Sequence, residues 1–302
     1  MSETRKIRMV LKSKPTIEGA GVHLKRVFGF SEVPVFDPFL LLDDFHSSEP
    51  RDYLQGFPWH PHRGIETITY VLYGDVEHGD SLGNKGVIGS GDVQWMTAGS
   101  GIIHQEMPKG DDKGKMWGFQ LWANLPAAEK MMAPRYRDVK SDQIPEVALD
   151  SGVKARIICG SVAGKSGPVT DIVTEPTYLD IRVPADTEYV HPVKSGHTVF
   201  AYVIEGRGAF CREKEPFGYE VKGASYFDMQ REALVGKETL VLFEPGDQVF
   251  VTTEEEPVRF LLVSGRPIGE PVAWQGPIVM NTQEELRVAF EDYRNGTFIQ
   301  HR

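Results

Sequence analysis

Short runs of alternating apolar and polar residues, each ended by turn residues, recur along this chain and set its fold class. The run IETITYVLYG at 65–74 places Ile68, Tyr70 and Leu72 at a period of two, which a half-buried β-strand requires. A similar run occupies 116–125, and 31 glycines and 20 prolines supply turns between the runs. The pattern predicts an all-β protein.

A change of character in the middle of the chain divides it into two parts. Residues 124–147 are rich in proline, charge and small residues and show no sustained periodicity, as expected of a connection between domains. Beyond it the strand pattern resumes, and TVFAYVIEG at 198–206 matches ETITYVLYG at 66–74 in its tyrosine, valine and glycine. We therefore predict two copies of one barrel, an N-terminal barrel over 1–135 and a C-terminal barrel over 136–302.

The end of the chain changes to a helical period. Thr282 and Glu285 have the spacing of a capping box, and Asn295 with Gly296 forms a typical helix stop. Apolar residues recur between them at i, i+3, i+4 and i+7, namely Leu286, Ala289, Phe290 and Tyr293. We predict a C-terminal helix that packs this stripe on the barrels or across their interface, with a partner-binding helix as the alternative.

Charge and cysteine content limit the partners and the compartment. The chain has 33 basic and 43 acidic residues, a formal net charge of −10, and an acidic surface repels phosphate backbones. We therefore expect no direct binding to nucleic acid. Only Cys159 and Cys211 are present, which fits a reducing compartment, so we expect a cytoplasmic protein, or also a nuclear one in a eukaryote. Runs of about 18 apolar residues are missing, so neither a signal peptide nor a membrane span is expected.

Two short motifs carry residue types that bind metals. The motif WHPHRGIE holds His60 and His62, and GSGIIHQEMP holds His104 and Glu106. In an extended strand, positions i and i+2 project to one face, so the two side chains of each pair point the same way. If the two segments are neighbouring strands of a barrel, three imidazoles and one carboxylate surround a common point. This donor set suits a divalent cation.

Each pair also has a less specific explanation. A lone His-x-His near a proline is more often a surface or turn feature than a metal site. Only both pairs together, within a strand and turn pattern, favour a metal. The other histidines are scattered and are interpreted as structural or solvated: His23, His46, His78, His191, His197 and His301. The C-terminal barrel has no His-x-Glu pair after Gly246, so we predict that it is metal-free.

The two motifs and their surroundings resemble the pirin family, a branch of the bicupins in the cupin superfamily. The resemblance rests on H-P-H-R-G-x-E-T followed by G-D-x-Q-W-M-T-A-G-x-G-I-x-H-x-E, and it extends to FDPFLLLDDF and WANLPAAEK. It implies two cupin-type barrels with one metal, usually iron, in the N-terminal barrel. The implied ligands are His60, His62, His104 and Glu106.

The resemblance also implies an activity. Several pirins show quercetin 2,3-dioxygenase activity, in which a flavonol, a flat aromatic substrate, is cleaved with O2. The alternative is a redox-sensitive, iron-binding regulatory protein of the transcriptional co-regulator type that binds a protein partner without turnover. Metal-dependent chemistry on another enol or polyol is a third hypothesis. Side chains near the motifs could line a cavity for a flat substrate, namely Phe57, Trp59, Trp95, Met96 and Met107.

The chemistry of the ligand atoms limits which metals can bind and which residues can act as the catalytic base. Nitrogen and oxygen donors without thiolate favour Fe(II), with Mn, Ni, Co, Cu or Zn as alternatives, and a closed zinc site would be structural. Glu106 is expected to accept the substrate proton. Glu66 lies an even number of positions from His60 and His62, so an unbroken strand would direct it to the same interior. It is a candidate to orient a histidine or a bound water or to act as the base, and a barrel-lining carboxylate without a metal role is the alternative.

Overall fold

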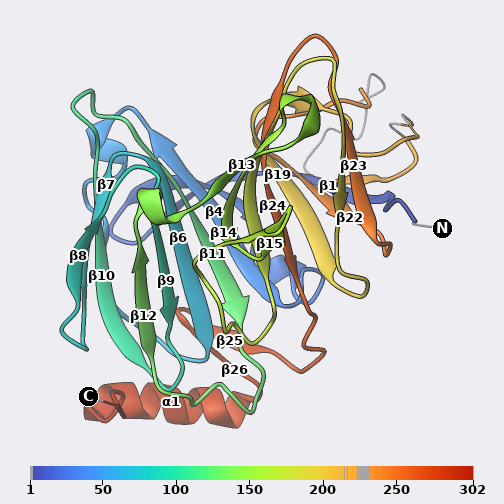
Figure 1. Cartoon of the computed structure of the whole chain (residues 1–302). Helices are drawn as coiled ribbons and strands as arrows, with labels where there is room; N and C mark the ends of the chain where they lie inside the picture. Colours follow the sequence, from blue (N-terminus) through green and yellow to red (C-terminus); the bar gives the residue numbers. More distant parts are fainter. Residues whose placement is uncertain (1–2, 214, 216, 223–231, 302) are drawn as a thin grey trace. The chain divides into compact units, whose positions relative to one another are not determined.

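The computed structural model describes residues 3–213, 215, 217–222 and 232–301 of the 302-residue chain. Short strands joined by turns make up most of this part, and its α-helix lies near the C-terminus (Figure 1). The predicted all-β class with a C-terminal helix is confirmed. Contacts divide the chain into two compact units. The N-terminal unit comprises residues 15–143 and 268–302, and the C-terminal unit comprises residues 1–14 and 144–267.

Two main sheets and one two-stranded sheet beside the C-terminal helix build the N-terminal unit. The larger has the strand order β12-β9-β6-β11-β4-β3-β2, and the smaller has the order β5-β10-β7-β8. Their strands are β2 (Lys14–Glu18), β3 (Val22–Phe28), β4 (Phe39–Ser47), β5 (Phe57–His62), β6 (Ile65–Tyr73), β7 (Asp75–Asp80), β8 (Lys85–Ile88), β9 (Val93–Thr97), β10 (Ile102–Lys109), β11 (Met116–Asn124) and β12 (Arg135–Val139). Along β10, buried residues alternate with partly exposed ones, so one face of this strand is directed inward.

Helix α1 (Gln283–Asn295) closes one end of the N-terminal unit. Thr282 and Glu285 form the predicted capping box, and Gly296 ends the helix at a φ of 73°. Leu286 and Ala289 are buried in a cluster with residues of β25 (Ala273–Gln275) and β26 (Ile278–Met280), the strands beside the helix in Figure 1. Leu286, Ala289 and partly buried Phe290 of the apolar stripe therefore pack on a barrel, the first of the two uses expected from the sequence, whereas Tyr293 is 41% exposed.

Buried polar contacts join this C-terminal segment to the turn between β5 and β6. Arg63 donates to Asp292 Oδ2 at 2.8 Å and to the Phe298 carbonyl oxygen at 3.0 Å. Gly64 has a φ of +79°, and a Cβ there would lie 1.9 Å from the Val279 carbonyl oxygen, so only glycine fits. The turn that follows His62 is thus held against β26 and α1.

The C-terminal unit has one large sheet, and one face of its strands packs in an extensive apolar cluster. Its main sheet has the order β13-β14-β17-β24-β19-β22-β1-β20, with β21 paired to β19, and β18 pairs separately with β23. The strands are β1 (Ile7–Lys12), β13 (Glu146–Ala148), β14 (Lys154–Cys159), β17 (Thr177–Val183), β18 (Glu188–Pro192), β19 (Thr198–Gly208), β20 (Glu220–Lys222), β21 (Val235–Gly236), β22 (Thr239–Phe243), β23 (Gln248–Thr252) and β24 (Val258–Gly265), and a small hairpin joins β15 (Ser161–Val162) to β16 (Lys165–Ser166). Valine, isoleucine and leucine dominate the core, as expected for strands buried on one face.

The two units differ from the predicted residue ranges at both ends of the chain. Strand β1 pairs with β22, so residues 1–14 lie in the C-terminal unit, whereas 268–302 lie in the N-terminal unit. The predicted ranges divide the chain at a single point. In the structure, strand pairing and helix packing join segments that are far apart in the sequence, so each unit is made of two separate segments. The division into an N-terminal barrel over 1–135 and a C-terminal barrel over 136–302 stays a prediction.

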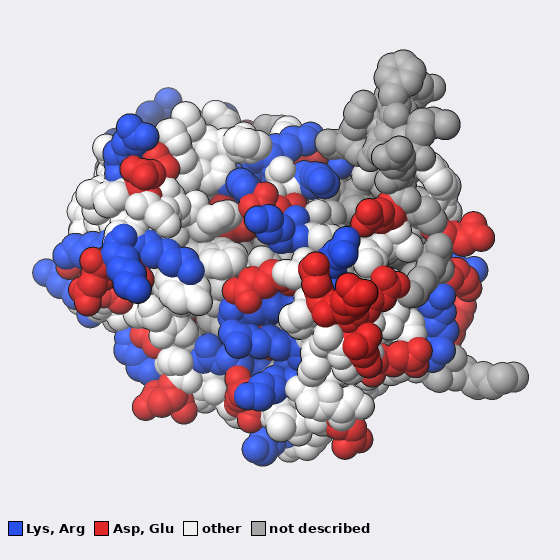
Figure 2. All heavy atoms as spheres, turned by 90° about the horizontal axis from the view of Figure 1, so that it is seen from above, with Lys and Arg blue, Asp and Glu red and all other residues white. Residues whose placement is uncertain are grey.

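Charged side chains of both signs cover the face drawn in Figure 2, where basic and acidic residues lie intermixed. Ion pairs join charged residues of the described part of the chain, as Lys140 is paired with Asp92 at 3.0 Å and with Asp138 at 2.9 Å. That the chain does not bind nucleic acid directly stays a prediction. Within the described part of the chain, no helix has both the length and the apolarity that a membrane span needs.

Candidate metal centre

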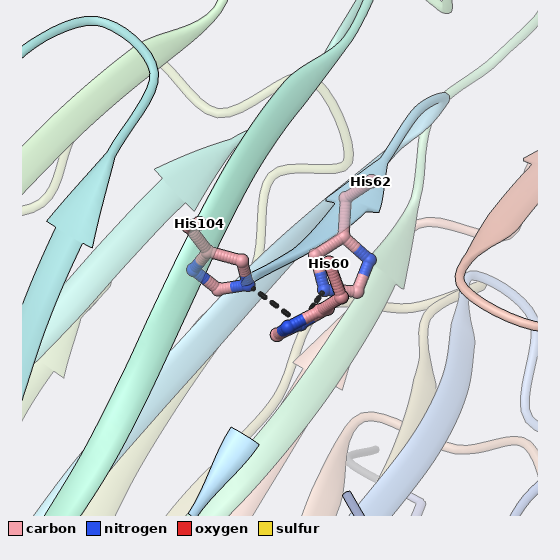
Figure 3. Close-up of side chains that lie close together, drawn as sticks. All are labelled: His60, His62 and His104. Atoms are coloured by element: carbon pink, nitrogen blue, oxygen red, sulfur yellow. Dashed lines mark hydrogen bonds between the residues drawn. The ribbon is translucent and has the colours of Figure 1, made fainter. Parts of the chain in front are cut away.

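Strands β5 and β10 are antiparallel neighbours, and this pairing brings the two histidine motifs together. His60 lies directly opposite His104, and His62 lies opposite Ile102. Because His60 and His62 are two positions apart, their rings share the face of β5 that His104 approaches. Figure 3 shows the three rings directed toward one another. The predicted side-by-side strands are confirmed.

The three imidazoles converge through their Nε2 atoms. His60 Nε2 lies 3.1 Å from His62 Nε2 and 2.9 Å from His104 Nε2. One ligand nitrogen from each of the three residues lies within 4.8 Å of the others. Three nitrogens at these separations can share a single ion.

The partners of the Nδ1 atoms define which nitrogen faces the centre. His60 Nδ1 lies 2.9 Å from the Pro58 carbonyl oxygen, and His62 Nδ1 lies 3.0 Å from that of Pro277. A carbonyl oxygen only accepts, so each Nδ1 carries the hydrogen and each Nε2 presents a lone pair. Burial lowers the pKa of His62 and of His104 well below the usual value, which favours neutral rings. Lone pairs directed at one point repel each other, so this donor set fits a cation.

Glu106 lies on the same face of β10 as His104, two residues further on, and is buried. Its Oε1 lies 2.9 Å from Thr69 Oγ1, and it lines the same cavity as His60 and His62. The group whose ligand atoms all lie within 4.8 Å of one another contains the three histidines but not Glu106. The structure thus brings three predicted ligands together, and Glu106 as the fourth ligand stays a prediction.

Glu66 is directed to the opposite face of β6 from Thr69, because the two are three positions apart in a regular strand. Thr97 Oγ1 donates to Glu66 Oε1 at 2.6 Å, and Arg135 lies 4.0 Å away. Burial raises the pKa of Glu66, and it is not among the residues that line the cavity. The expected direction assumed one unbroken strand, whereas β5 ends at His62 and β6 begins at Ile65, so the even spacing does not place Glu66 on the face of the histidines. A role of Glu66 beside the metal stays a prediction. Its contacts favour a buried carboxylate without a metal role.

A cavity of about 610 Å³ opens beside the three histidines. Of the residues expected to line it, Phe57 does so, whereas Trp59 is 51% exposed and Trp95 and Met96 are buried in the core. Met107 is not among the lining residues either. The apolar wall comes instead from residues that the motifs did not indicate: Phe30, Leu41, Trp122 and Trp274. Trp274 lies on β25, so only the folded chain brings it to the site.

His78 is a functional candidate that the sequence interpretation treated as structural or solvated. It lies on β7 opposite Glu106 and is buried. Its ring centroid is 5.5 Å from that of His104 and 4.9 Å from that of Tyr136, on which it stacks, and its Nε2 lies 3.4 Å from Asp80 Oδ2. His78 and Asp80 have the same i, i+2 spacing as the residues of the two motifs. The spacing alone could not show that His78 lies beside His104, because this follows from the pairing of β7 with β10.

The C-terminal unit has its own cavity of about 680 Å³, lined by His191 and Cys159 among others. His191 Nδ1 lies 2.9 Å from the Tyr189 hydroxyl, and burial lowers the pKa of His191 to about 4. His191 and His197 do not belong to a group of close ligand atoms in the described residues. A metal-free C-terminal barrel stays a prediction.

Comparisons with known proteins agree with this architecture. The family model described as Pirin matches residues 21–123, and the Pirin C-terminal cupin domain matches residues 178–299. A Pirin-like protein of Caulobacter vibrioides is 43% identical over 295 residues, covering 97% of this chain and 99% of that one. The crystal structure of a quercetin 2,3-dioxygenase from Acinetobacter baumannii has a TM-score of 0.85 at 29% identity, covering 98% of this chain and 99% of that one. The pirin YhhW from Escherichia coli, solved with nickel(II), shares the fold at a TM-score of 0.62 and 20% identity, over 85% and 98% of the two chains. The two-barrel cupin fold is confirmed.

Proposed function

Because the chain belongs to the pirin family, we propose that it is a metal-dependent dioxygenase of the quercetin 2,3-dioxygenase type, which cleaves a flavonol with O2. The observation that carries this proposal is the convergence of three histidine Nε2 atoms beside a cavity of about 610 Å³. A cavity of that size is within the range that encloses a drug-sized ligand. The similarity to the Acinetobacter quercetin 2,3-dioxygenase supports the same reaction class.

The proposed ligands of one divalent metal are His60, His62, His104 and Glu106. Imidazole nitrogen and carboxylate oxygen without thiolate favour Fe(II), and Mn, Ni, Co, Cu and Zn are the alternatives. When bound, the metal supplies Lewis acidity that lowers the pKa of a substrate hydroxyl, together with the redox chemistry that O2 requires. The backbone carbonyls of Pro58 and Pro277 hold two of the imidazoles in the tautomer that presents Nε2.

Glu106 is the proposed base for the substrate hydroxyl. The Thr69 hydroxyl lies 2.9 Å from Oε1 of Glu106. Among the described residues, no other side chain or backbone group forms a hydrogen bond with this carboxylate. Oε2 is therefore left to accept the proton of a hydroxyl bound beside the histidines.

The apolar wall serves to orient a flat substrate and to exclude water. Trp122 meets the ring of His62 edge-on at 5.0 Å, and Trp274 lies 5.7 Å from Trp122. Aromatic side chains in such arrangements offer faces and edges on which planar rings pack. Removal of water strengthens the electrostatic interactions of Glu106 and the histidines with the substrate.

The test is O2 uptake with quercetin by iron-loaded protein. We expect turnover in the wild type, and in His60→Ala the loss of both stoichiometric metal and O2 uptake, because one of three converging nitrogens is removed. His23→Ala, which changes an exposed histidine, is the matched control and should keep both. Stoichiometric metal without O2 uptake for Fe, Mn, Ni, Co and Cu would overturn the dioxygenase proposal and favour the regulatory alternative.

A further inference from the structure

Four neighbouring strands each have one polar residue at directly opposite positions, and these residues face the barrel interior. Arg26 of β3 lies opposite Asp43 of β4, Asp43 lies opposite Gln120 of β11, and Gln120 lies opposite Thr69 of β6. All four residues line the cavity of about 610 Å³. We refer to Arg26, Asp43, Gln120 and Thr69 as the polar row.

The residues next to the polar row on β3, β4 and β11 are mainly apolar, whereas β6 has Thr67 opposite Trp122. Leu24 lies two residues from Arg26 on β3, and Phe45 lies two residues from Asp43 on β4. Both belong to a buried apolar cluster of the N-terminal unit. Two residues away in the other direction along β4 and β11 are Leu41 and Trp122, which line the cavity. The charged and amide side chains of this wall therefore lie in the polar row, where burial of polar groups has a free-energy cost unless they are hydrogen-bonded.

One end of the polar row reaches the candidate metal centre. The Thr69 hydroxyl lies 2.9 Å from Glu106 Oε1 and 2.7 Å from Gln120 Oε1. The other end is Arg26, whose Nε and Nη2 donate to Asp43 at 2.9 and 2.7 Å, and whose Nη1 donates to Glu18 Oε1 at 2.8 Å. Three strand spacings of about 4.8 Å separate the backbones of Thr69 and Arg26, or roughly 14 Å.

The polar row has donors that these contacts do not use. A guanidinium has five N–H groups, and three of those of Arg26 are occupied by Asp43 and Glu18. Thr69 has one hydroxyl hydrogen, which Glu106 Oε1 accepts, so the Gln120 amide satisfies its contact with Thr69 by donating one N–H to Thr69 Oγ1. The second amide hydrogen of Gln120 has no acceptor in the described part of the chain. Arg26 and Gln120 can therefore each donate to an oxygen atom of a molecule in the cavity.

The charges around Arg26 determine whether a charged or a neutral oxygen atom of a ligand can bind there. Asp43 and Glu18 place two carboxylates against one guanidinium, a local formal charge of −1. A carboxylate or phosphate would be repelled there, whereas a neutral hydroxyl can accept from the guanidinium and donate to a carboxylate.

We infer that the polar row is a second binding subsite, in which Gln120, next to Thr69, and Arg26, further from Glu106, hydrogen-bond hydroxyl groups on the outer ring of the substrate. The inference rests on the proposed function and narrows its substrate class to planar polyphenols that carry neutral oxygen substituents at both ends. Flavonols with a hydroxylated outer ring fit this class. Flavonols with a bare outer ring leave the donors of Arg26 and Gln120 unpaired, and binding is weaker.

The experiment is calorimetric titration of metal-loaded protein without O2, with quercetin and with the flavonol that lacks the outer-ring hydroxyls. We expect the wild type to bind quercetin about tenfold more tightly, the effect of one to two hydrogen bonds. Gln120→Met and Arg26→Lys should reduce this preference to about twofold or less. Gln55→Met, which changes an exposed glutamine, should keep it.

The outcomes separate this inference from the proposed function. An unchanged preference in both folded, metal-loaded variants, or a wild type that binds the two flavonols equally, overturns the subsite even if O2 uptake is observed. A preference that depends on Gln120, without any O2 uptake, supports the subsite and overturns the dioxygenase. Failure of the wild type to bind either flavonol overturns both. Arg26→Lys keeps the charge beside buried Asp43, and Gln120→Met removes no charge, so the two variants test the subsite independently.

Discussion

At the scale of single residues, the candidate site depends on which imidazole nitrogen carries the hydrogen. Two backbone carbonyls accept from the Nδ1 atoms of His60 and His62, and this leaves the Nε2 lone pairs to face His104. One of these carbonyls belongs to Pro277, far along the chain. Glu106 is oriented by a comparable contact, because Thr69 Oγ1 lies 2.9 Å from its Oε1. His60, His62 and Glu106 thus each have a neighbour that orients them, whereas Nδ1 of His104 is buried without a hydrogen-bond partner among the described residues.

Thr69→Val tests this orientation. We expect kcat/KM for quercetin to fall about tenfold in the iron-loaded protein, because a buried carboxylate loses a hydrogen bond worth about 1.5 kcal/mol. Thr69→Ser keeps the hydroxyl and is the matched control, with an expected change of less than about threefold. Equal kcat/KM values in Thr69→Val and the wild type would contradict the role of Thr69.

At the scale of elements, a buried lysine joins the turn after β5 to β26 and β11. Lys130 Nζ donates to the carbonyl oxygens of Gly64 and Val279 at 2.9 and 3.1 Å and to Asn124 Oδ1 at 2.7 Å. Because Gly64 follows His62 closely, this contact fixes the end of the strand that carries two predicted ligands. Burial lowers the pKa of Lys130 to about 7.

That pKa predicts a pH dependence of stability. An unfolded lysine titrates near pH 10.4, so between about pH 7 and pH 10 the unfolded chain binds more protons at Lys130 than the folded chain does. The free energy of unfolding should therefore rise with pH in this window, by up to about 1.4 kcal/mol per pH unit from this group. Urea unfolding at several pH values measures it.

Lys130→Met should remove this slope and lower stability throughout, because three acceptors lose their donor. The matched control is Lys113→Met, which changes an exposed lysine and should keep the slope. Parallel pH profiles for Lys130→Met and the wild type would show that Lys130 is charged in the folded protein across the window.

At the scale of the whole molecule, the predicted metal ligands and the cavity belong to the N-terminal unit alone. Segment 268–302 contributes the Pro277 carbonyl and Trp274 to this unit. The site therefore depends on both segments of the unit, residues 15–143 and 268–302. The C-terminal unit has a separate core formed mainly by β14, β17, β19, β22 and β24.

Metal binding should therefore protect one unit selectively. At a free metal concentration of 100 times Kd the bound state gains about 2.7 kcal/mol, so amides of β5, β10 and β26 should exchange with deuterium more slowly when metal is added. Amides of β17 and β24 should not change. Hydrogen exchange followed by mass spectrometry measures both sets, and His60→Ala should abolish the difference. Equal protection of both units would contradict a metal site confined to the N-terminal unit.

Local patterns in the sequence were sufficient for the fold class, the C-terminal helix and the shared face of His60 and His62, whereas the approach of His104 depends on the pairing of β5 with β10. A period of two defines which face of a strand a residue occupies, so the shared face of His60 and His62 follows from two neighbouring positions. The capping box at Thr282 and the stop at Gly296 are likewise local, and the structure has both. Such signals need only a few consecutive residues.

Tertiary structure alone decided which side chains surround the histidines. The turn at Gly64 directs Glu66 away from the cavity, the pairing of β7 with β10 brings His78 to His104, and β25 supplies Trp274. The polar row exists only through the register of four strands. Strand register and long-range packing depend on the burial of the whole chain, so a local period cannot encode which distant segments meet.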